Sequence, residues 1–140
     1  EIIEYLLSKC NLLKLNESEL ELIITWFSKE KFNEESSVRF LQAEYNIDEV
    51  IVTKGGEGAS YYTKSTAYSF PAFKVKVADT CGSGDSFLAA FLAKKFEGES
   101  AETCMIYATG LGAFVASHEG ACPAYNIEKL ESYIFQKQTS

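Results

Sequence analysis

The chain has 140 residues, of which 46% are hydrophobic, a length and composition that fit one domain with a sizeable core and argue against disorder. Its net charge of −7 argues against a general nucleic-acid or anionic-membrane binder, although a local cradle of amides can still bind an anion such as ATP. There is no signal peptide and no long apolar span, so we expect a cytoplasmic protein without nucleic-acid or membrane partners. The cysteines form no C-x-x-C pair and there is one histidine, so we expect free thiols rather than a zinc site at Cys10, Cys81, Cys104 and Cys122.

The first third of the chain shows alternating helix and strand patterns. Apolar spacing predicts three helices and two buried strands, over residues 1–9 (helix), 11–15 (strand), 20–27 (helix), 37–45 (helix) and 49–53 (strand). The charged residues 29–37 are interpreted as a loop or a helix margin. Asn16 and Glu19 have the spacing of a capping box, in which Asn16 caps the following helix and Glu19 reaches back.

A glycine-rich segment, Thr53-Lys54-Gly55-Gly56-Glu57-Gly58, follows the strand over 49–53. A hairpin turn explains its glycines, and it is not a Walker A loop because the Gly-Lys-Ser/Thr ending is absent. Lys54 is interpreted as solvated, with a phosphate contact as the alternative. Residues 61–64 and 66–70 are predicted to pair as a hairpin, Pro71 ends it, and alternation over 73–77 predicts a half-buried edge strand.

The stretch from Asp79 to Asp85 carries the strongest chemical signal. Small residues at 82–84 let the backbone approach a ligand, and the buried helix predicted over 86–96 directs free N–H groups at it. An anion cradle beside a carboxylate suits phosphoryl transfer to an alcohol. The alternative is a plain strand-to-helix turn, in which Asp85 only interacts favourably with the helix dipole.

The last third is predicted to be helical. The helix over 101–117 is rich in small residues, which permit close packing, and Gly120 is expected to be a left-handed cap followed by Pro123. His118 is interpreted as structural rather than catalytic. A closing amphipathic helix over 126–136 is expected to direct Ile127, Leu130 and Ile134 inward.

The pattern Asp79-Thr80-x-Gly-Ser-Gly-Asp85-x-x-x-Ala89-Ala90-Phe91-Leu92 resembles the C-terminal signature of the ribokinase-like (PfkB) carbohydrate kinases. Every constrained position of that signature is filled. The segment Lys14-Leu15-Asn16-Glu17-x-Glu19-Leu20 is similar to fructokinase-type members. The resemblance covers nearly the full chain but only the C-terminal part of the family fold.

The resemblance implies a role for each matching residue. Asp85 would be the catalytic base, and the backbone amides of Gly82, Ser83 and Gly84 would form the anion hole. The other implied roles concern ions and ATP. Asn16 and Glu19 would help to place Mg²⁺ and the phosphates through water, and Asp79 would hold K⁺ with backbone oxygens near Cys81, Val115, His118 and Gly120.

The nucleotide itself would be bordered by Thr53, Gly55 and Gly58. Thr109 and Gly112 would be candidate walls of the adenine pocket, and Gly120 would line the nucleotide site.

We therefore expect an α/β fold, a partial Rossmann-like (ribokinase-like) layered sheet with flanking helices. The resemblance implies that the N-terminal half of the family fold is missing, and the chain opens at Glu1, without a methionine and inside an apparent helix. Residues 1–140 would form a single domain, the C-terminal nucleotide-binding and catalytic portion of a sugar kinase.

The expected activity is ATP-dependent phosphoryl transfer to a hydroxyl of a small sugar, and a fructose-like sugar is the preferred candidate substrate. The expected cofactors are ATP and Mg²⁺, with K⁺ as a further candidate ion. The chain alone is expected to be inactive, and its exposed half-interface could drive homo-oligomer formation. The alternatives are a kinase for a nucleoside or another small alcohol, and a non-catalytic nucleotide-binding or interaction module.

Overall fold

The computed structural model describes residues 1–29, 31–120, 123–124 and 126–139. Within them the chain forms two compact units, which we treat one at a time. The first comprises Glu1–Lys54 with Ala59–Ser69, and the second comprises Gly55–Gly58 with Phe70–Ser140.

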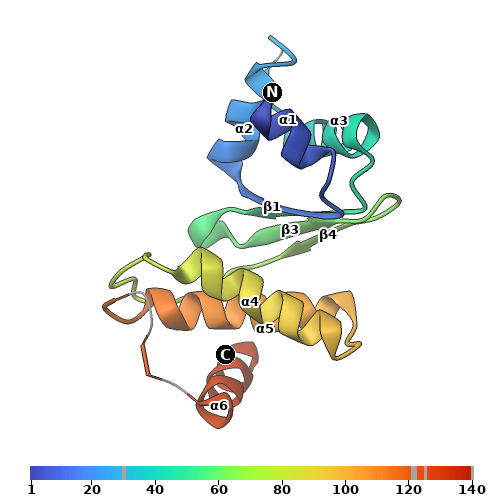
Figure 1. Ribbon diagram of the computed structural model, residues 1–140. Helices are drawn as coiled ribbons and strands as arrows, with labels where there is room; N and C mark the ends of the chain where they lie inside the picture. The colour runs from blue at the N-terminus through green and yellow to red at the C-terminus, as the bar shows by residue number, and fades with distance from the viewer. Residues whose placement is uncertain (30, 121–122, 125, 140) are drawn as a thin grey trace. The chain divides into compact units, whose positions relative to one another are not determined.

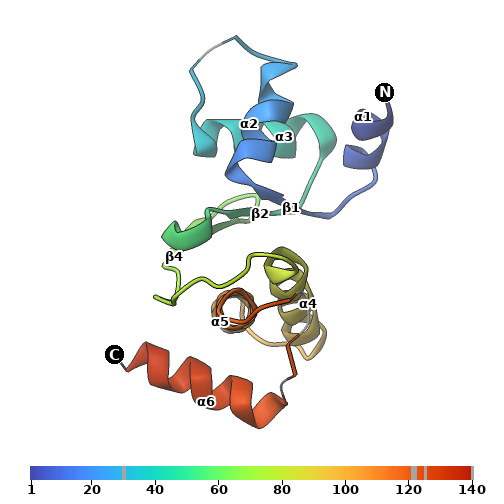
Figure 2. The ribbon, with the colours of Figure 1, turned by 90° about the vertical axis from the view of Figure 1, so that its left-hand side faces the viewer.

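The first unit is a mixed sheet with three helices on one face (Figures 1 and 2). Strand β1 is parallel to β2 and β2 is antiparallel to β3, in the strand order β1-β2-β3-β4. The helices and the inner face of the sheet share one apolar core that includes Leu20, Val38, Leu41, Val50 and Val52. The elements are α1 (Ile2–Leu7), β1 (Leu12–Asn16), α2 (Glu17–Thr25), α3 (Glu34–Tyr45), β2 (Glu49–Thr53), β3 (Ala59–Tyr62) and β4 (Ala67–Phe70), whose last residue belongs to the second unit.

Side-chain caps set where the helices of this unit begin. The predicted capping box is confirmed, since the Glu19 N–H donates to Asn16 Oδ1 and the Asn16 N–H donates to Glu19 Oε2, both at 2.8 Å. Helix α3 begins at Glu34 rather than at residue 37, because Asn33 Oδ1 accepts the Ser36 N–H at 2.9 Å. Of the charged residues interpreted as a loop or a helix margin, Lys29 and Lys31 lie outside any helix, as that interpretation allows. Glu34 and Glu35 are in the first turn of α3, where acids interact favourably with its dipole.

The second unit contains a short 3₁₀ turn, η1 (Gly55–Glu57), and three helices, α4 (Ser83–Phe96), α5 (Ala101–Ala116) and α6 (Ile127–Gln138). Helix α5 packs against both α4 and α6 (Figure 1). Leu130 and Ile134 of α6 are buried in this core, as predicted. Ile127 is not: it is 71% exposed, because it is the first residue of α6 and lies beyond the packed face.

The predicted strand over 73–77 is wrong. These residues are extended but belong to no strand. The Phe73 ring packs on a helix instead, edge-on against Tyr133 of α6 at a centroid distance of 6.4 Å, whereas Val77 is 58% exposed. The segment ends at Ala78, whose N–H donates to the Ala116 carbonyl of α5 at 2.8 Å. The alternation over 73–77 therefore does not mark a hydrogen-bonded ladder.

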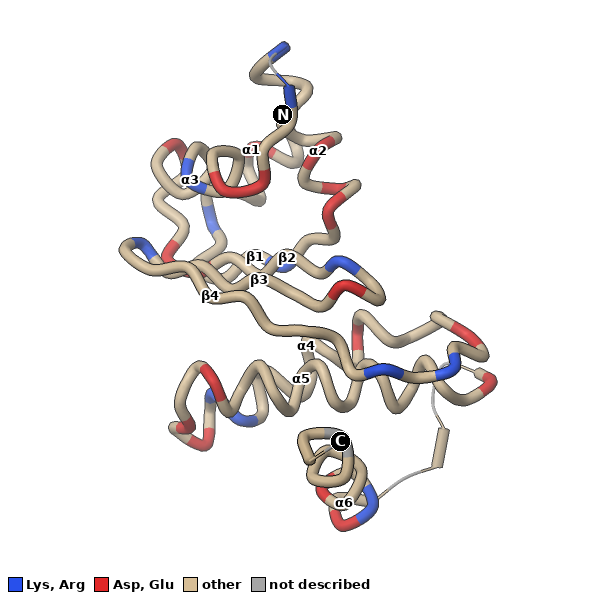
Figure 3. Tube along the Cα trace, turned by 180° about the vertical axis from the view of Figure 1, so that it is seen from behind, with Lys and Arg blue, Asp and Glu red and all other residues tan. Residues whose placement is uncertain are grey.

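The charged residues cluster along the chain, and the described cysteines are free thiols, as expected. Acidic segments lie on α1, α2 and α3, and two basic stretches lie on the extended segment between β4 and α4 (Figure 3). Cys10, Cys81 and Cys104 are free thiols, whereas Cys122 lies outside the described residues. No helix among the described residues is long and apolar enough to span a membrane.

Candidate functional site

The loop before α4 ends in a left-handed residue. Gly82, the N-cap of α4, has φ 76° and ψ −6°, a conformation that glycine adopts at little cost. The helix therefore begins at Ser83, three residues earlier than predicted, and its first turn contains Ser83, Gly84 and Asp85. Asp85 is exposed, so its carboxylate lies at the positive end of the helix dipole and is open to solvent.

The backbone N–H groups of this turn differ in their partners. The Ser83 N–H donates to the Thr80 carbonyl at 3.2 Å, and the Ser83 hydroxyl donates to the same oxygen at 2.9 Å. Among the described residues, the N–H groups of Gly82, Gly84 and Asp85 have no hydrogen-bond acceptor. Unpaired N–H groups at a helix N-terminus form an anion-binding site. Of the three predicted anion-hole amides, that of Ser83 already has a protein acceptor.

Asp79 connects this loop to the end of α5. Its Oδ1 accepts the Cys81 N–H at 2.8 Å, and its Oδ2 accepts the Gly120 N–H at 3.2 Å. The Asp79 N–H in turn donates to the Ala116 carbonyl at 3.2 Å. The side chain of Asp79 thus holds two loops together, a structural role that a proposed K⁺ site would share.

We expect Asp79→Ala to lower the free energy of unfolding by about 1–2 kcal/mol, because two backbone N–H groups lose a charged acceptor at a partly exposed site. Urea denaturation monitored by circular dichroism measures the change. Glu119→Ala is the control, since Glu119 is exposed and neighbours Gly120. Equal stability of the two variants would contradict the role given to Asp79.

Asn16, Glu19 and Thr53 come together in the first unit. Asn16 and Thr53 are register partners at the carboxyl ends of the parallel strands β1 and β2, and Glu19 lies in the adjacent first turn of α2. The Thr53 hydroxyl donates to the Leu15 carbonyl at 3.4 Å. Asn16 and Glu19 are both exposed, so this strand edge is open to a polar ligand.

The donor set at this strand edge suits a hydrated cation rather than a directly bound one. Among the described residues, no three His, Cys, Asp or Glu side chains form a group that could hold a metal. One carboxylate and one amide are hard oxygen ligands of the kind that a Mg²⁺ ion uses when it keeps most of its waters and also contacts phosphates. The residues therefore fit the water-mediated role that the resemblance implies.

The expectation that Lys54 is solvated is wrong. Lys54 Nζ donates to the Ser60 hydroxyl at 2.8 Å and lies 3.3 Å from Glu34 Oε2, while the Tyr62 hydroxyl donates to Glu34 Oε1 at 2.6 Å. Burial alone would raise the pKa of Glu34, but hydrogen bonds from Tyr62 and Ser60 and the charge of Lys54 outweigh it and lower that pKa. Burial and the neighbouring Glu34 carboxylate raise the pKa of Tyr62 strongly.

Sequence reasoning missed the partners of Lys54. The available signal was Ser60, a polar residue in β3 (Ala59–Tyr62), where all four residues are buried. A buried hydroxyl needs hydrogen-bond partners, and Lys54 is one of those that Ser60 has.

The glycines in and beside η1 differ in whether the surrounding structure leaves room for a side chain. Gly55 has φ 54° with open space around it, whereas Gly58 has φ 103° and is buried. A Cβ at Gly58 would overlap the Phe70 carbonyl oxygen and lie 2.8 Å from the Ala72 nitrogen. Gly58 is therefore required by backbone packing, and the hairpin between β2 and β3 is confirmed.

The small residues of α5 serve packing. A Cβ at Gly112 would lie 3.3 Å from the Ser83 carbonyl oxygen, so this glycine lets α5 approach the start of α4. A Cβ at Gly110 would lie within 3 Å of Ile134 and Phe73 side-chain atoms. The Thr109 hydroxyl donates back to the Met105 carbonyl at 2.7 Å, within its own helix. No contact here tests the adenine-wall role of Thr109 and Gly112.

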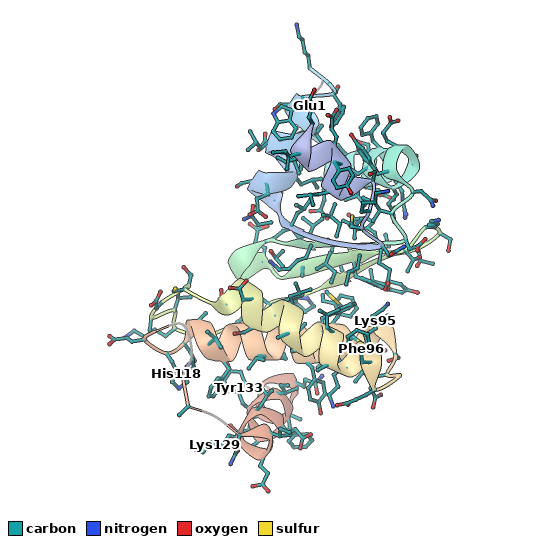
Figure 4. The ribbon with its side chains drawn as sticks, in the orientation of Figure 1. Glu1, Lys95, Phe96, His118, Lys129 and Tyr133 are labelled. Carbon is teal, nitrogen blue, oxygen red and sulfur yellow. The ribbon has the colours of Figure 1, made fainter. Side chains whose placement is uncertain are left out.

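The end of α5 places the histidine and the last candidate glycine. His118 follows the last turn of α5 (Figure 4). Its ring lies against that of Phe114 at a centroid distance of 4.4 Å and an angle of 34°, and its Nδ1 lies 2.7 Å from the Phe114 carbonyl, contacts expected of a structural histidine. Gly120 is left-handed as predicted, with φ 87°, but it is not the C-cap, which is Ser117.

Solved structures establish the fold class. Ribokinase from Thermotoga maritima matches with a TM-score of 0.85 and 30% identity, covering 94% of this chain and 44% of that one. A ribokinase II from E. coli, in complex with ATP and Mg²⁺, matches with a TM-score of 0.84 and 25% identity, covering 96% and 42%. The α/β fold is therefore ribokinase-like, as the sequence predicted.

A family model described as pfkB family carbohydrate kinase matches residues 1–128, and the chain belongs to this family. Relatives differ in the substrates that their names state. A fructokinase of Solanum tuberosum is 30% identical over 123 residues, or 83% of this chain and 37% of that protein. An ATP-dependent ribose-1-phosphate kinase of Halopiger xanaduensis is 29% identical over 103 residues, or 74% and 35%. A nucleoside kinase of Methanocaldococcus jannaschii is 34% identical over 93 residues, or 62% and 31%.

The chain spans 31% to 37% of the length of these three relatives. The comparisons thus give the family and the fold, while substrate and activity are matters of proposal.

Proposed function

We propose that this chain is the C-terminal nucleotide-binding and catalytic portion of an ATP-dependent kinase that phosphorylates a hydroxyl of a small sugar. The observation that carries the proposal is the first turn of α4, where an exposed carboxylate, Asp85, lies beside backbone N–H groups without an acceptor. Membership of the pfkB family supports it.

In the proposed mechanism Asp85 takes the proton from the acceptor hydroxyl as that oxygen attacks the terminal phosphoryl group of ATP, whose bond to the β-phosphate oxygen breaks so that ADP leaves. The amides of Gly82, Ser83 and Gly84 donate to the oxygens of this group as negative charge accumulates on them. The geometry favours Gly82 and Gly84 as immediate donors, because Ser83 must first release the Thr80 carbonyl.

The remaining residues are proposed to hold ATP and its ions. Bound Mg²⁺ would offset the charge of the phosphates. Asn16 and Glu19 would orient its water shell, as their exposed positions at the end of β1 allow. Thr53, Gly55 and Gly58 would border the phosphates and ribose, and Thr109, Gly112 and Gly120 the base. Asp79 would share a K⁺ ion with nearby backbone oxygens, which is supported by its place between the loops at Cys81 and Gly120.

A fructose-like sugar is our first choice of substrate, because the segment around Asn16 is similar to fructokinases and a fructokinase is among the relatives. The relatives named ribose-1-phosphate kinase and nucleoside kinase make a nucleoside or another small alcohol the second candidate. The free thiols support a cytoplasmic location. We propose that the chain by itself has no kinase activity.

The test is a calorimetric titration of ATP with Mg²⁺ into this chain and into its Gly84→Val variant. We expect binding by the parent and a loss of at least about tenfold in the variant, because a branched side chain in the first turn of α4 obstructs the amides that face the anion. Ala89→Val is the matched control, since it introduces the same branched side chain at an exposed position of α4 away from its first turn. Equal affinity of the parent and the Gly84→Val variant would contradict the site.

A further inference from the structure

A charged network joins both ends of the connection between β2 and β3. Lys54 leaves the end of β2 and donates to Ser60 in β3 across the base of the glycine-rich turn, at 2.8 Å. Glu34, the first residue of α3, accepts from Tyr62 of β3 at 2.6 Å and lies 3.3 Å from Lys54. We call these four residues, Glu34, Lys54, Ser60 and Tyr62, the Lys54 network.

The network is mostly withdrawn from solvent. The side chains of Lys54 and Glu34 are each 18% exposed, and Ser60 and Tyr62 are each about 5% exposed. The Arg39 guanidinium lies over the Tyr62 ring, 5.5 Å from its centroid, and covers it further. By contrast, the ion pair between Lys64 and Asp48 in the same unit has side chains that are 53% and 51% exposed.

A partly buried ion pair adds little to stability, because removing two charges from water offsets much of their attraction. Such pairs are retained in some proteins for the geometry that they impose. Here the geometry is specific, because Lys54 is bonded on one side to the helix that covers the sheet and on the other to the strand that follows the turn.

The segment between these anchor points depends on them for its position. Gly55 to Glu57 are exposed and therefore accessible to a ligand, while Gly55 and Gly58 have positive φ. Glycine permits many backbone conformations, so fixed ends help to select one of them, together with the packing of Gly58 against Phe70 and the Gly58 N–H that donates to the Gly55 carbonyl at 3.2 Å. Thr53, directly before Lys54, faces Ala59 in the register of β2 and β3.

We infer that Glu34, Lys54 and Tyr62 are positioning residues for the nucleotide: they fix Thr53 and Gly55–Gly58 in the conformation that borders the phosphates. This inference rests on the proposed function. It gives Lys54 a role that differs from a direct phosphate contact, since the charge of Lys54 is already paired with Glu34. The phosphate-binding groups of this segment are then neutral backbone amides, joined by the Thr53 hydroxyl once it releases the Leu15 carbonyl.

The first test is hydrogen exchange on the free chain, measured at the amides of residues 53–60 in Lys54→Met, Glu34→Gln and the control Lys64→Met. We expect exchange to become about tenfold faster at residues 53–60 in the first two variants and to stay unchanged in the control. A merely stabilising role would accelerate exchange through β1, α2 and α3 equally. Unchanged or uniformly faster exchange would overturn the inference.

The second test titrates ATP with Mg²⁺ into the same variants. We expect both Lys54→Met and Glu34→Gln to bind about tenfold more weakly, with Lys64→Met unchanged. Weaker binding by Lys54→Met alone would mean a direct phosphate contact and would also overturn the inference. If the parent chain binds no ATP, the proposed site fails, while the exchange experiment still decides whether the Lys54 network fixes the segment.

Discussion

Asp85→Ala is expected to lower kcat for sugar phosphorylation by about 10²–10⁴-fold, the usual contribution of a general base. Because we propose that the chain by itself has no kinase activity, the measurement uses a chimera in which the N-terminal portion of the Solanum tuberosum fructokinase precedes residue 1. Because Asp85 is exposed in the first turn of α4, its removal leaves no cavity. We therefore expect the affinity for ATP and the thermal midpoint to change little.

Glu102→Ala is the matched control for this prediction. Glu102 is the acidic residue in the first turn of α5, as Asp85 is in the first turn of α4. Both variants lose a favourable interaction with a helix dipole, about 0.3–1 kcal/mol. Only the Asp85 variant should lose turnover. If the two variants retained similar kcat values, Asp85 would be a helix-stabilising residue and the proposed base would be wrong.

Gly58→Ala is expected to have the largest effect on stability. Alanine at φ 103° is strained, and its Cβ would overlap the carbonyl oxygen of Phe70, which is backbone and not a flexible side chain. Strain and overpacking together should lower the free energy of unfolding by at least about 2 kcal/mol. Scanning calorimetry should then show a fall in Tm of about 5–10 °C.

Two neighbouring glycines separate the causes. Gly55→Ala keeps the conformational penalty, with φ 54°, but meets open space, so about 1 kcal/mol is expected. Gly56→Ala has neither positive φ nor a close neighbour and should stay within about 0.5 kcal/mol of the parent. A Gly58 variant no less stable than the Gly55 variant would show that the Phe70 contact is easily relieved.

Local signals in the sequence were sufficient for most of the fold. Asn16 and Glu19 predicted a capping box that the structure contains, because both partners lie within one turn. The strand over 49–53 was predicted with its observed bounds.

Long-range partners account for the errors. Residues 73–77 alternate like a strand, but Phe73 packs on Tyr133, sixty positions later, and no local pattern predicts that. Lys54 was interpreted as solvated because its partners, Glu34 and Ser60, lie in other elements. The inward direction of Ile127 failed because periodicity gives the face of a helix but not how far along it the packing extends.

The loop that contains Asp79 forms hydrogen bonds with residues that are synthesised later. Asp79 accepts from Gly120, 41 positions further on, and Ala78 and Asp79 both donate to the carbonyl of Ala116. During synthesis, residues 78–85 therefore cannot complete these bonds until α5 has left the exit tunnel and folded. The first unit lacks this dependence, since β1, β2 and β3 are joined within residues 12–62. Cotranslational folding should then be sequential, with the strand-end residues Asn16 and Thr53 in place before the turn that carries Asp85.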